Sequence, residues 1–359
     1  MNEGRRLLLK KLLALLLLLC MLPALPAQAD LPLVYPEETV LCMLRLTDAQ
    51  RRLAEVLYTP VLAGEEKIPL PEGTRYKDVG PAMQCLMLTY PELFHLGRSY
   101  TISYWQNEPD KAISVSPEYR MDARRAGQLR GQLYEAALEM IAVNPTAVGL
   151  HDALVARVTY GGTDDMRHTA VGALLEGKAT CEGYSQALTL LYRMAGIPCG
   201  IITGVGVDSM TGWPENHSWN IINLGGYSLI DATWNDQEGA GLNTYWYFGL
   251  SSWQMAADHT PGADMSVPVC GDHAGWHVRM GACASSMEEV YAAVQRLAIY
   301  GTPLNLRITD AALYRAIVSD PGAVLDGYND QCPEGYEFYG RYSYLFSDAQ
   351  QCIIMQRGE

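Results

Sequence analysis

The stretch from residue 177 to residue 231 constrains the fold more than any other part of the chain, because it combines a predicted helix with a predicted hairpin. An apolar pattern with helical spacing follows Cys181 and stops at Gly196, with Pro198 close behind, so we predict a helix that begins at the cysteine. The free N–H groups and the dipole at a helix N-terminus favour an anion. The sequence therefore favours the thiolate form of Cys181.

His217 and Asp231 fall on two predicted strands joined by a Gly-Gly turn. A strict two-residue turn would place the two side chains on opposite faces, because side chains alternate along a strand. A three-residue loop instead pairs Asn223 with Tyr227 and makes His217 a same-face diagonal neighbour of Asp231. We predict this second register, in which an imidazole–carboxylate bond can form. The two predicted strands span residues 217–223 and 227–234.

A cysteine, a histidine and an aspartate thus follow one another, each in a distinct local setting. They are the parts of an activated thiol: a nucleophile, a base, and a carboxylate that orients the base. The pattern resembles the transglutaminase-like superfamily, whose core is similar to that of papain-type cysteine proteases. The matching pieces are Gly177-x-x-x-Cys181-x-Gly183-Tyr184, Gly196-Ile197-Pro198, Gly204, His217-x-Trp219-Asn220 and Asp231-x-Thr233-Trp234-x-Asp236.

The resemblance implies an α+β fold in which the nucleophile begins a helix that packs on an antiparallel sheet. It implies that Cys181 is the nucleophile, that His217 is general base and then general acid, and that Asp231 orients His217. Core and site-wall positions are expected for three aromatic residues, Tyr184, Trp219 and Trp234. The sequence departs from many relatives at two positions that do not touch the chemistry, with Thr180 in place of Val and Ala232 in place of Pro.

Length and pattern divide the 359 residues into five segments, and a hydrophobic fraction of 49% allows a sizeable core. The predicted segments are a signal peptide at 1–29, an N-terminal α+β accessory region at 30–145, the catalytic core at 146–258, an irregular loop at 259–284 and a small C-terminal α+β module at 285–359. Within the accessory region, an apolar stripe predicts a long helix over 123–142.

The N-terminus has the pattern of a secretory signal. Four basic residues precede an apolar run over 12–19, and Ala27-Gln28-Ala29 has the small-x-small form of a cleavage site, so we expect a secreted or extracytoplasmic chain that starts at Asp30. A lipoprotein at Cys20 is disfavoured because Leu19 precedes it where a small residue is expected. An uncleaved anchor stays open, although the apolar run is short for a spanning helix.

The formal charge of −14 argues against nucleic acid and anionic membranes as partners, because phosphate groups require Lys and Arg. A membrane contact is expected only through an uncleaved signal. The charge is compatible with basic or neutral peptides. We therefore expect a peptide or protein substrate, with a cell-wall peptide among the candidates.

Export would permit disulfides without requiring them. Spacing alone suggests the pairs Cys270–Cys283 and Cys332–Cys352, whereas Cys199 lies in a strand-like run and is expected to be a buried free thiol.

No cofactor and no metal are expected. Cys270, His273, His277 and Cys283 are zinc-ligand types, but their spacing matches no zinc motif, so a loop beside the site is the favoured interpretation. Asp164-Asp165 suggests calcium, but two carboxylates fall far short of the six to eight oxygens that calcium takes.

The function predicted from the sequence is acyl transfer at an amide bond through a thioester on Cys181. The backbone N–H of Cys181 is one candidate oxyanion donor, and Tyr160 is a candidate for the second. Hydrolysis of a peptide or isopeptide bond is favoured over cross-linking. The alternative is an inactive transglutaminase-like fold that serves as an extracellular binding or scaffold protein.

Overall fold

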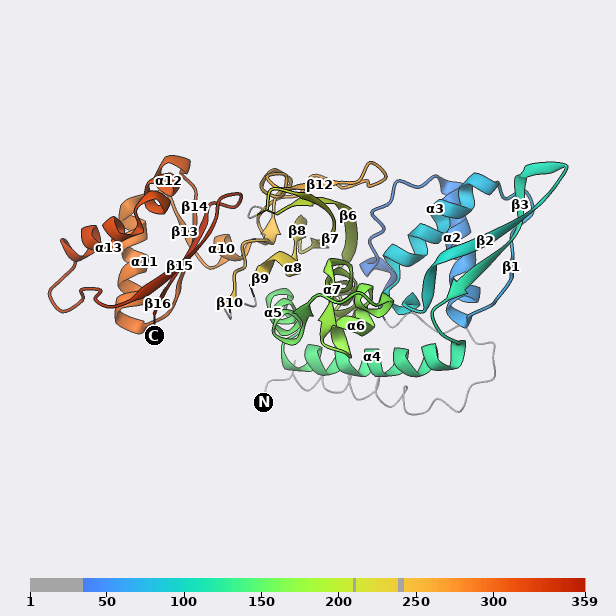
Figure 1. Cartoon of the computed structure of the whole chain (residues 1–359), viewed down its shortest axis with the longest axis horizontal. Coiled ribbons are helices and arrows are strands. Elements are labelled where there is room, and N and C mark those ends of the chain that lie inside the picture. Colours follow the sequence, from blue (N-terminus) through green and yellow to red (C-terminus); the bar gives the residue numbers. More distant parts are fainter. Residues whose placement is uncertain (1–34, 209–210, 238–241, 359) are drawn as a thin grey trace.

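The computed structural model describes residues 35–208, 211–237 and 242–358, so the predicted signal peptide lies outside the described residues. Three regions follow one another along the long axis of the molecule, in chain order from the blue end to the red end of Figure 1. The fold is of the mixed α+β class that the sequence predicted. Within the described residues, no helix has both the length and the apolar character that a membrane span requires.

The N-terminal region packs two helices against a three-stranded antiparallel sheet of order β1-β3-β2. A long helix, α4, then runs along the base of the molecule (Figure 1). It spans Ala123–Val143 and confirms the helix predicted over 123–142. The other elements are α2 (Asp48–Ala63), α3 (Tyr76–Thr89), β1 (Ile68–Pro69), β2 (Leu96–Trp105) and β3 (Glu108–Tyr119).

The central region is built around helix α7, Cys181–Met194, which begins at the cysteine as predicted. Its residues from Gly183 to Arg193 are all buried, because α5 and α6 cover it on one side and strands β6 and β7 on the other. The bounds are α5 (Ala147–Arg157), α6 (Ala170–Leu174), β6 (Cys199–Val207) and β7 (Pro214–Asn223).

A five-stranded antiparallel sheet of order β11-β8-β7-β6-β12 forms the platform. The hairpin register is the predicted one, because Asn223 pairs with Tyr227. Short strand pairs flank the sheet. The remaining bounds are β4 (Thr159–Tyr160), β5 (Lys178–Ala179), β8 (Tyr227–Ile230), β9 (Asp236–Gln237), β10 (Leu242–Asn243) and β11 (Phe248–Leu250).

The predicted strand over 227–234 is too long. Strand β8 ends at Ile230, and Asp231 becomes the N-cap of the short helix α8, Ala232–Asn235. Its Oδ1 accepts hydrogen bonds from the backbone N–H groups of Thr233 and Trp234, at 2.9 and 3.2 Å. Capping by aspartate overrides the strand propensity of Thr and Trp here.

The prediction of an irregular loop over 259–284 is wrong at its start and near its end. Residues His259–Pro261 form β12, which pairs with β6 along the edge of the central sheet. The segment also contains α10 (Trp276–Arg279) and β13 (Cys283–Ala284), and α9 (Ser252–Met255) precedes it. A three-residue edge strand has too little periodicity to be read from sequence, because its partner strand defines it.

The C-terminal region packs three helices on a four-stranded sheet of order β13-β14-β16-β15 (Figure 1, orange to red). Its elements are α11 (Met287–Tyr300), α12 (Ala311–Ser319), α13 (Pro321–Asn329), β14 (Leu304–Ile308), β15 (Tyr342–Ser347) and β16 (Cys352–Arg357).

All eight cysteines in the described part of the chain are free. The pairs suggested from spacing are therefore wrong: the thiols of Cys270, Cys332 and Cys352 lie against the carbonyl oxygens of Pro268, Asn329 and Gln350. Cys199 is a buried free thiol, as predicted.

Candidate active site

Cys181 is half-buried at the first position of α7. The first turn of this helix is held closely by the preceding segment, because a Cβ at Gly183 would lie 2.3 Å from the carbonyl oxygen of Arg167. The hydroxyl of Thr180 donates to that same oxygen at 3.2 Å. These contacts set the position of the cysteine, while the helix N-terminus supplies backbone N–H groups around it.

His217 lies on β7 and Asp231 at the end of β8, and both are buried. Nε2 of His217 lies 2.7 Å from Oδ2 of Asp231. The structure thus brings these two residues together in the diagonal relationship that the three-residue hairpin loop predicts. Cys181 also lies close enough to His217 to help raise the pKa of the imidazole.

Opposing effects set the charge of this pair. Burial lowers the pKa of His217, but the charge of Asp231, its hydrogen bond and the contact with Cys181 outweigh burial and raise the pKa to about 10. Burial would raise the pKa of Asp231, yet His217 and His259 hold it below the usual value for a carboxyl group. At neutral pH the two residues form a buried ion pair.

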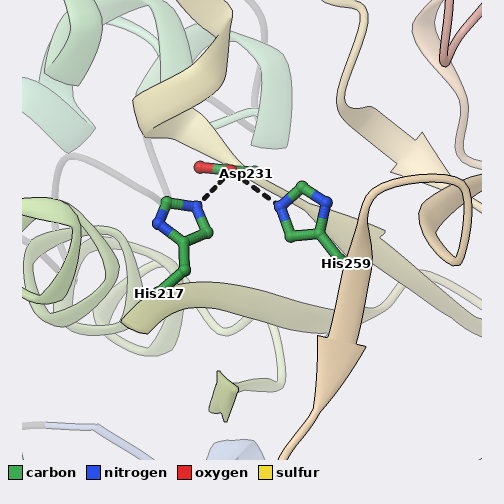
Figure 2. Close-up of side chains that lie close together, drawn as sticks. All are labelled: His217, Asp231 and His259. Atoms are coloured by element: carbon green, nitrogen blue, oxygen red, sulfur yellow. Dashed lines mark hydrogen bonds and ion pairs between the residues drawn. The ribbon is translucent and has the colours of Figure 1, made fainter. Parts of the chain in front are cut away.

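Sequence reasoning missed His259. This residue is 2% exposed at the start of β12, and its Nε2 lies 3.1 Å from the same Oδ2 of Asp231. Figure 2 shows the carboxylate of Asp231 between the two imidazoles. The adjacent Asp258-His259 pair was the available signal, but only the pairing of β12 with β6 brings it to the site.

A cavity of about 420 Å³ opens beside His217. Trp234 and Tyr160 line it, and Phe346 and Ser347 of β15 supply a wall from the C-terminal region. Three carboxylates also line it, from Asp208, Glu215 and Asp236. No Lys or Arg is present among its lining residues in the described part of the chain.

The sequence of this region matches the family model for the transglutaminase-like superfamily over residues 142–233. The chain contains a transglutaminase-like core. No curated protein matches the sequence.

Solved structures similar to this chain include a candidate cysteine protease from Cytophaga hutchinsonii, with 14% identity, a TM-score of 0.24, and coverage of 38% of this chain and 61% of that one. A TGase structure has 13% identity and a TM-score of 0.27, with coverage of 46% of this chain and 48% of that one. The periplasmic domain of TgpA from Pseudomonas aeruginosa has 17% identity and a TM-score of 0.23, with coverage of 38% of this chain and 63% of that one. The matches therefore span less than two thirds of each of these structures.

Of the three predicted wall residues in the transglutaminase-like core, only Trp234 lines the cavity beside His217. Trp219 is 1% exposed, and its ring stacks near His217 with centroids 6.1 Å apart. Tyr184 is fully buried, with its hydroxyl 2.8 Å from the carbonyl oxygen of Val158 and 2.5 Å from Oδ2 of Asp236. Trp219 and Tyr184 are therefore core residues that pack next to the site and do not line the cavity.

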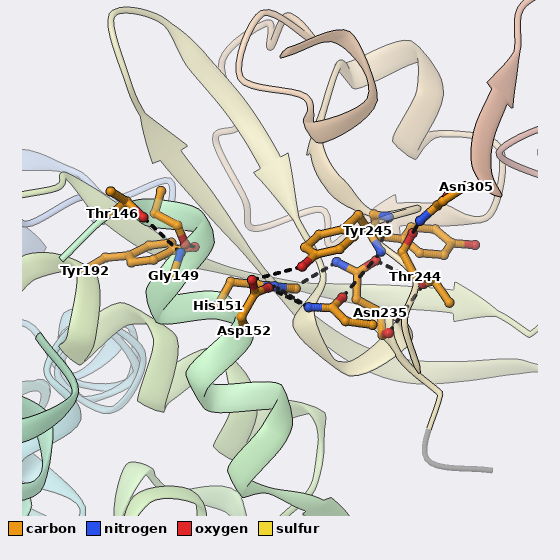
Figure 3. A network of polar contacts seen from close by, with 12 residues as sticks. Thr146, Gly149, His151, Asp152, Tyr192, Asn235, Thr244, Tyr245 and Asn305 are labelled. Atoms are coloured by element: carbon orange, nitrogen blue, oxygen red, sulfur yellow. Dashed lines mark hydrogen bonds and ion pairs between the residues drawn. The ribbon is translucent and has the colours of Figure 1, made fainter. Parts of the chain in front are cut away.

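A buried polar network holds α8, whose cap is Asp231 (Figure 3). Nδ2 of Asn235 lies 3.0 Å from Nε2 of His151 on α5, and Oδ1 of Asn235 accepts from the backbone N–H of Tyr247 at 2.8 Å. Nδ2 of Asn305 on β14 donates to the carbonyl oxygen of Thr244 at 2.9 Å. The network therefore connects the element that carries Asp231 to α5 of the central region and to the C-terminal region.

Among the described residues, one group of side chains has metal-ligand types and spacing: His217, Asp231 and His259, with ligand atoms within 4.8 Å of one another. These atoms already bond to one another through Oδ2 of Asp231, so the group fits a hydrogen-bonded chain. Nε2 of His277, from the suggested zinc set, lies 2.9 Å from Oδ1 of Asn305.

The pair suggested for calcium faces arginines instead. Asp164 makes an ion pair with Arg167 at 2.9 Å, and Asp165 lies 3.9 Å from Arg120. These contacts favour the solvated-loop interpretation of the segment.

Proposed function

We propose that the protein is a cysteine-dependent acyl-transfer enzyme that acts on amide bonds, with Cys181, His217 and Asp231 as its catalytic residues. The observation that carries the proposal is the buried His217–Asp231 ion pair, at 2.7 Å, in contact with a half-buried cysteine at a helix N-terminus. This arrangement keeps a proton on the imidazole beside the sulfur, which is the state that a thiol nucleophile needs.

In the proposed reaction, Sγ of Cys181 attacks the carbonyl carbon of the amide and forms a C–S bond. The C–N bond then breaks, and the imidazolium of His217 gives its proton to the leaving amine. Neutral His217 next takes a proton from water, whose oxygen attacks the thioester. The C–S bond breaks, the carboxylic acid leaves, and the thiolate–imidazolium pair is restored. Asp231 keeps the imidazole oriented and stabilises its charge throughout.

The cavity beside His217 supports a substrate with a positively charged group. Carboxylates from Asp208, Glu215 and Asp236 line it and place negative charge where the substrate would bind. An amine or a basic side chain would therefore be attracted here. We propose peptide or isopeptide hydrolysis as the main reaction, with water as the acceptor of the acyl group. Transfer to an amine is the competing outcome.

We also propose that the chain works outside the cytoplasm. This proposal depends on the basic, apolar and Ala-Gln-Ala segments of residues 5–29. Expression of the full chain in a bacterial host, followed by N-terminal sequencing of the extracytoplasmic fraction, is expected to give a mature start at Asp30. Retention of the protein in the cytoplasm would contradict it.

The test of the proposed function measures alkylation of Cys181 as a function of pH, with peptide mass spectrometry to separate it from the other thiols. In the wild type, fast modification is expected well below the usual thiol pKa of about 8.5. His217→Ala is expected to lose this reactivity, and buried Cys199 serves as the internal control. A basic peptide library then reports amide cleavage with and without an added amine.

If Cys181 reacts like an ordinary thiol in both proteins, the enzyme proposal fails. The alternative of an inactive fold with a binding role would then stand.

A further inference from the structure

His259 has a carboxylate oxygen on each ring nitrogen. Its Nδ1 lies 2.6 Å from Oδ1 of Asp258, and its Nε2 lies 3.1 Å from Oδ2 of Asp231. A neutral imidazole has only one N–H, and an ionised carboxylate can only accept. Both contacts are satisfied only if the group holds one extra proton, so His259 is an imidazolium or one of the two carboxyl groups is protonated.

The surroundings favour the imidazolium. The hydroxyl of Tyr247 donates to Oδ2 of Asp258 at 2.6 Å and stabilises that carboxylate. Burial disfavours a charged His259, but its hydrogen bonds to Asp231 and Asp258 outweigh burial and raise its pKa. Asp231 therefore has two cationic neighbours, His217 and His259, on one oxygen atom.

We propose that Asp258 and His259 are positioning residues that hold Asp231 and share its charge, so that His217 is not the only cation this carboxylate stabilises. The proposal deepens the proposed function, on which its catalytic consequence rests. Because His259 takes part of the attraction of Asp231, His217 gives up its proton to a leaving amine more readily than it would in a simple triad.

The fold places His259 by close packing of strand β12. This strand pairs with β6, where His259 faces Gly206 and Pro261 faces Gly204. A Cβ at Gly204 would lie 2.1 Å from the carbonyl oxygen of Thr260. The ring of His259 also contacts two tryptophans, with centroids 4.3 Å from Trp234 and 4.9 Å from Trp219. These aromatic side chains thus hold the ring of His259 in place, and the residue is 2% exposed.

The titratable groups around the two imidazoles are few. On the protein side they are Asp231, Asp258 and Tyr247, and the imidazole centroids lie 5.3 Å apart. On the cavity side His217 faces Cys181, and the other titratable cavity groups are Tyr160, Asp208, Glu215 and Asp236, together with Tyr247, which borders both sides. Substitutions at His259 and Asp258 change the protein side alone.

The test is nuclear magnetic resonance of the full chain with ¹⁵N-labelled histidine. In the wild type near pH 7, His259 is expected to carry protons on both ring nitrogens; a neutral ring would overturn the proposal. In His259→Gln, which keeps a donor but removes the charge, the pKa of His217 is expected to rise by about half a unit to one unit. Asp258→Asn is expected to cause a smaller rise.

A purely structural role would lower thermal stability without moving the titration of His217, and that result would also overturn the proposal. The resonance measurement does not require activity, so it separates this proposal from the triad: an unreactive Cys181 in the wild type would sink the proposed function alone. If the enzyme is active, His259→Gln is expected to lower kcat about three- to tenfold with KM little changed.

A different observation supports a second site. The Sγ atoms of Cys42 and of Cys85 on α3 lie 3.5 Å apart. The hydrogen bond from Cys85 outweighs burial and lowers the pKa of Cys42 to about 6, while the same bond and burial raise the pKa of Cys85. Cys42 is half-buried and Cys85 is buried, so a small reagent meets Cys42 first.

We propose that Cys42 and Cys85 form a disulfide by exchange with a small-molecule disulfide. The Cys42 thiolate attacks one sulfur of the reagent and releases a thiolate. Cys85 then loses its proton to that released thiolate and attacks the mixed disulfide, which closes the bond and releases the second half of the reagent as a thiolate. The sulfurs, now 3.5 Å apart, must approach by about 1.5 Å to reach the S–S bond length of about 2.05 Å.

The disulfide would strengthen the support of α7. The carbonyl oxygens of Met87 and Thr89, at the end of α3, accept hydrogen bonds from Gln186 and Arg193 of α7. A covalent bond between Cys42 and Cys85 of α3 would limit the movement of α3 away from α7.

The test treats the purified chain with oxidised glutathione and maps its peptides. A 42–85 cross-linked peptide is expected, with a rise in Tm that dithiothreitol reverses and that Cys85→Ser abolishes. A stable glutathione adduct on Cys42, or no change at either thiol, would overturn this second proposal.

Discussion

The two imidazoles of His217 and His259 share one oxygen atom, Oδ2 of Asp231, at 2.7 and 3.1 Å. The other carboxylate oxygen accepts two backbone N–H groups at the start of α8. Both carboxylate oxygens of Asp231 are therefore fixed by hydrogen-bond partners. Its charge is buried next to the imidazole of His217, which lies beside the nucleophile.

Replacement of Asp231 by Asn removes the charge and leaves the cap. Amide cleavage, measured as kcat/KM on a basic peptide, is expected to fall by about 10³- to 10⁴-fold, because the imidazole loses its orientation and its counter-charge. Glu135→Gln, on the exposed side of α4, is the matched control and should leave the rate unchanged. If the kcat/KM of the Asp231→Asn enzyme lies within tenfold of the wild-type value, Asp231 is not a member of the triad.

The His217–Asp231 pair makes stability depend on pH. The pKa of His217 is raised to about 10, so its contribution is complete below the unfolded value of about 6.5 and is lost as the pH rises through 10. The free energy of unfolding of the wild type is expected to fall by up to about 5 kcal/mol over that window. Urea titrations should show a flatter profile for His217→Gln; parallel profiles would contradict the ion pair.

The same pair responds to acid in the opposite direction. The pKa of Asp231 lies below its usual value, so its contribution is present above about 3.8 and is lost as the pH falls below that value. Acid unfolding followed by circular dichroism is expected to begin at a lower pH in the wild type than in His217→Gln, whose Asp231 lacks one cationic partner. Identical acid midpoints would argue against the depressed pKa.

Removal of negative charge from the cavity tests the proposed substrate class. The double change Asp208→Asn and Glu215→Gln removes two of the three lining carboxylates. KM for a basic peptide is expected to rise about three- to tenfold, with kcat nearly constant, while a neutral peptide of equal length should be unaffected. Equal effects on both peptides would show that these carboxylates do not select a cation.

Arg193 tests how α7 is supported. It is fully buried, and its guanidinium donates to the carbonyl oxygens of Cys199, Thr89 and Leu41. Arg193→Met removes the guanidinium donor from all three carbonyl oxygens, of which that of Cys199 still accepts from the N–H of Leu41. The unfolding free energy is therefore expected to drop by about 3 kcal/mol, with a smaller loss for Arg193→Lys. Equal stability of all three proteins in urea would contradict this role.

Local patterns predicted a large part of the site. The apolar spacing after Cys181 and the break at Gly196 defined helix α7, and the hairpin loop defined the register that brings His217 to Asp231. Both depend on residues close together in the chain. The end of β8 was missed because an aspartate cap competes with strand propensity, and sequence spacing does not show which one prevails.

The chain by itself determined the α+β class, the helix that carries the cysteine, and the order of cysteine, histidine and aspartate. Only the tertiary structure decided that His259, 28 residues beyond Asp231, shares its carboxylate, that Cys42 lies beside Cys85, and that β15 completes the cavity. The physical reason is that periodicity records which side of an element is buried, whereas contacts between distant segments depend on how the sheets and helices pack.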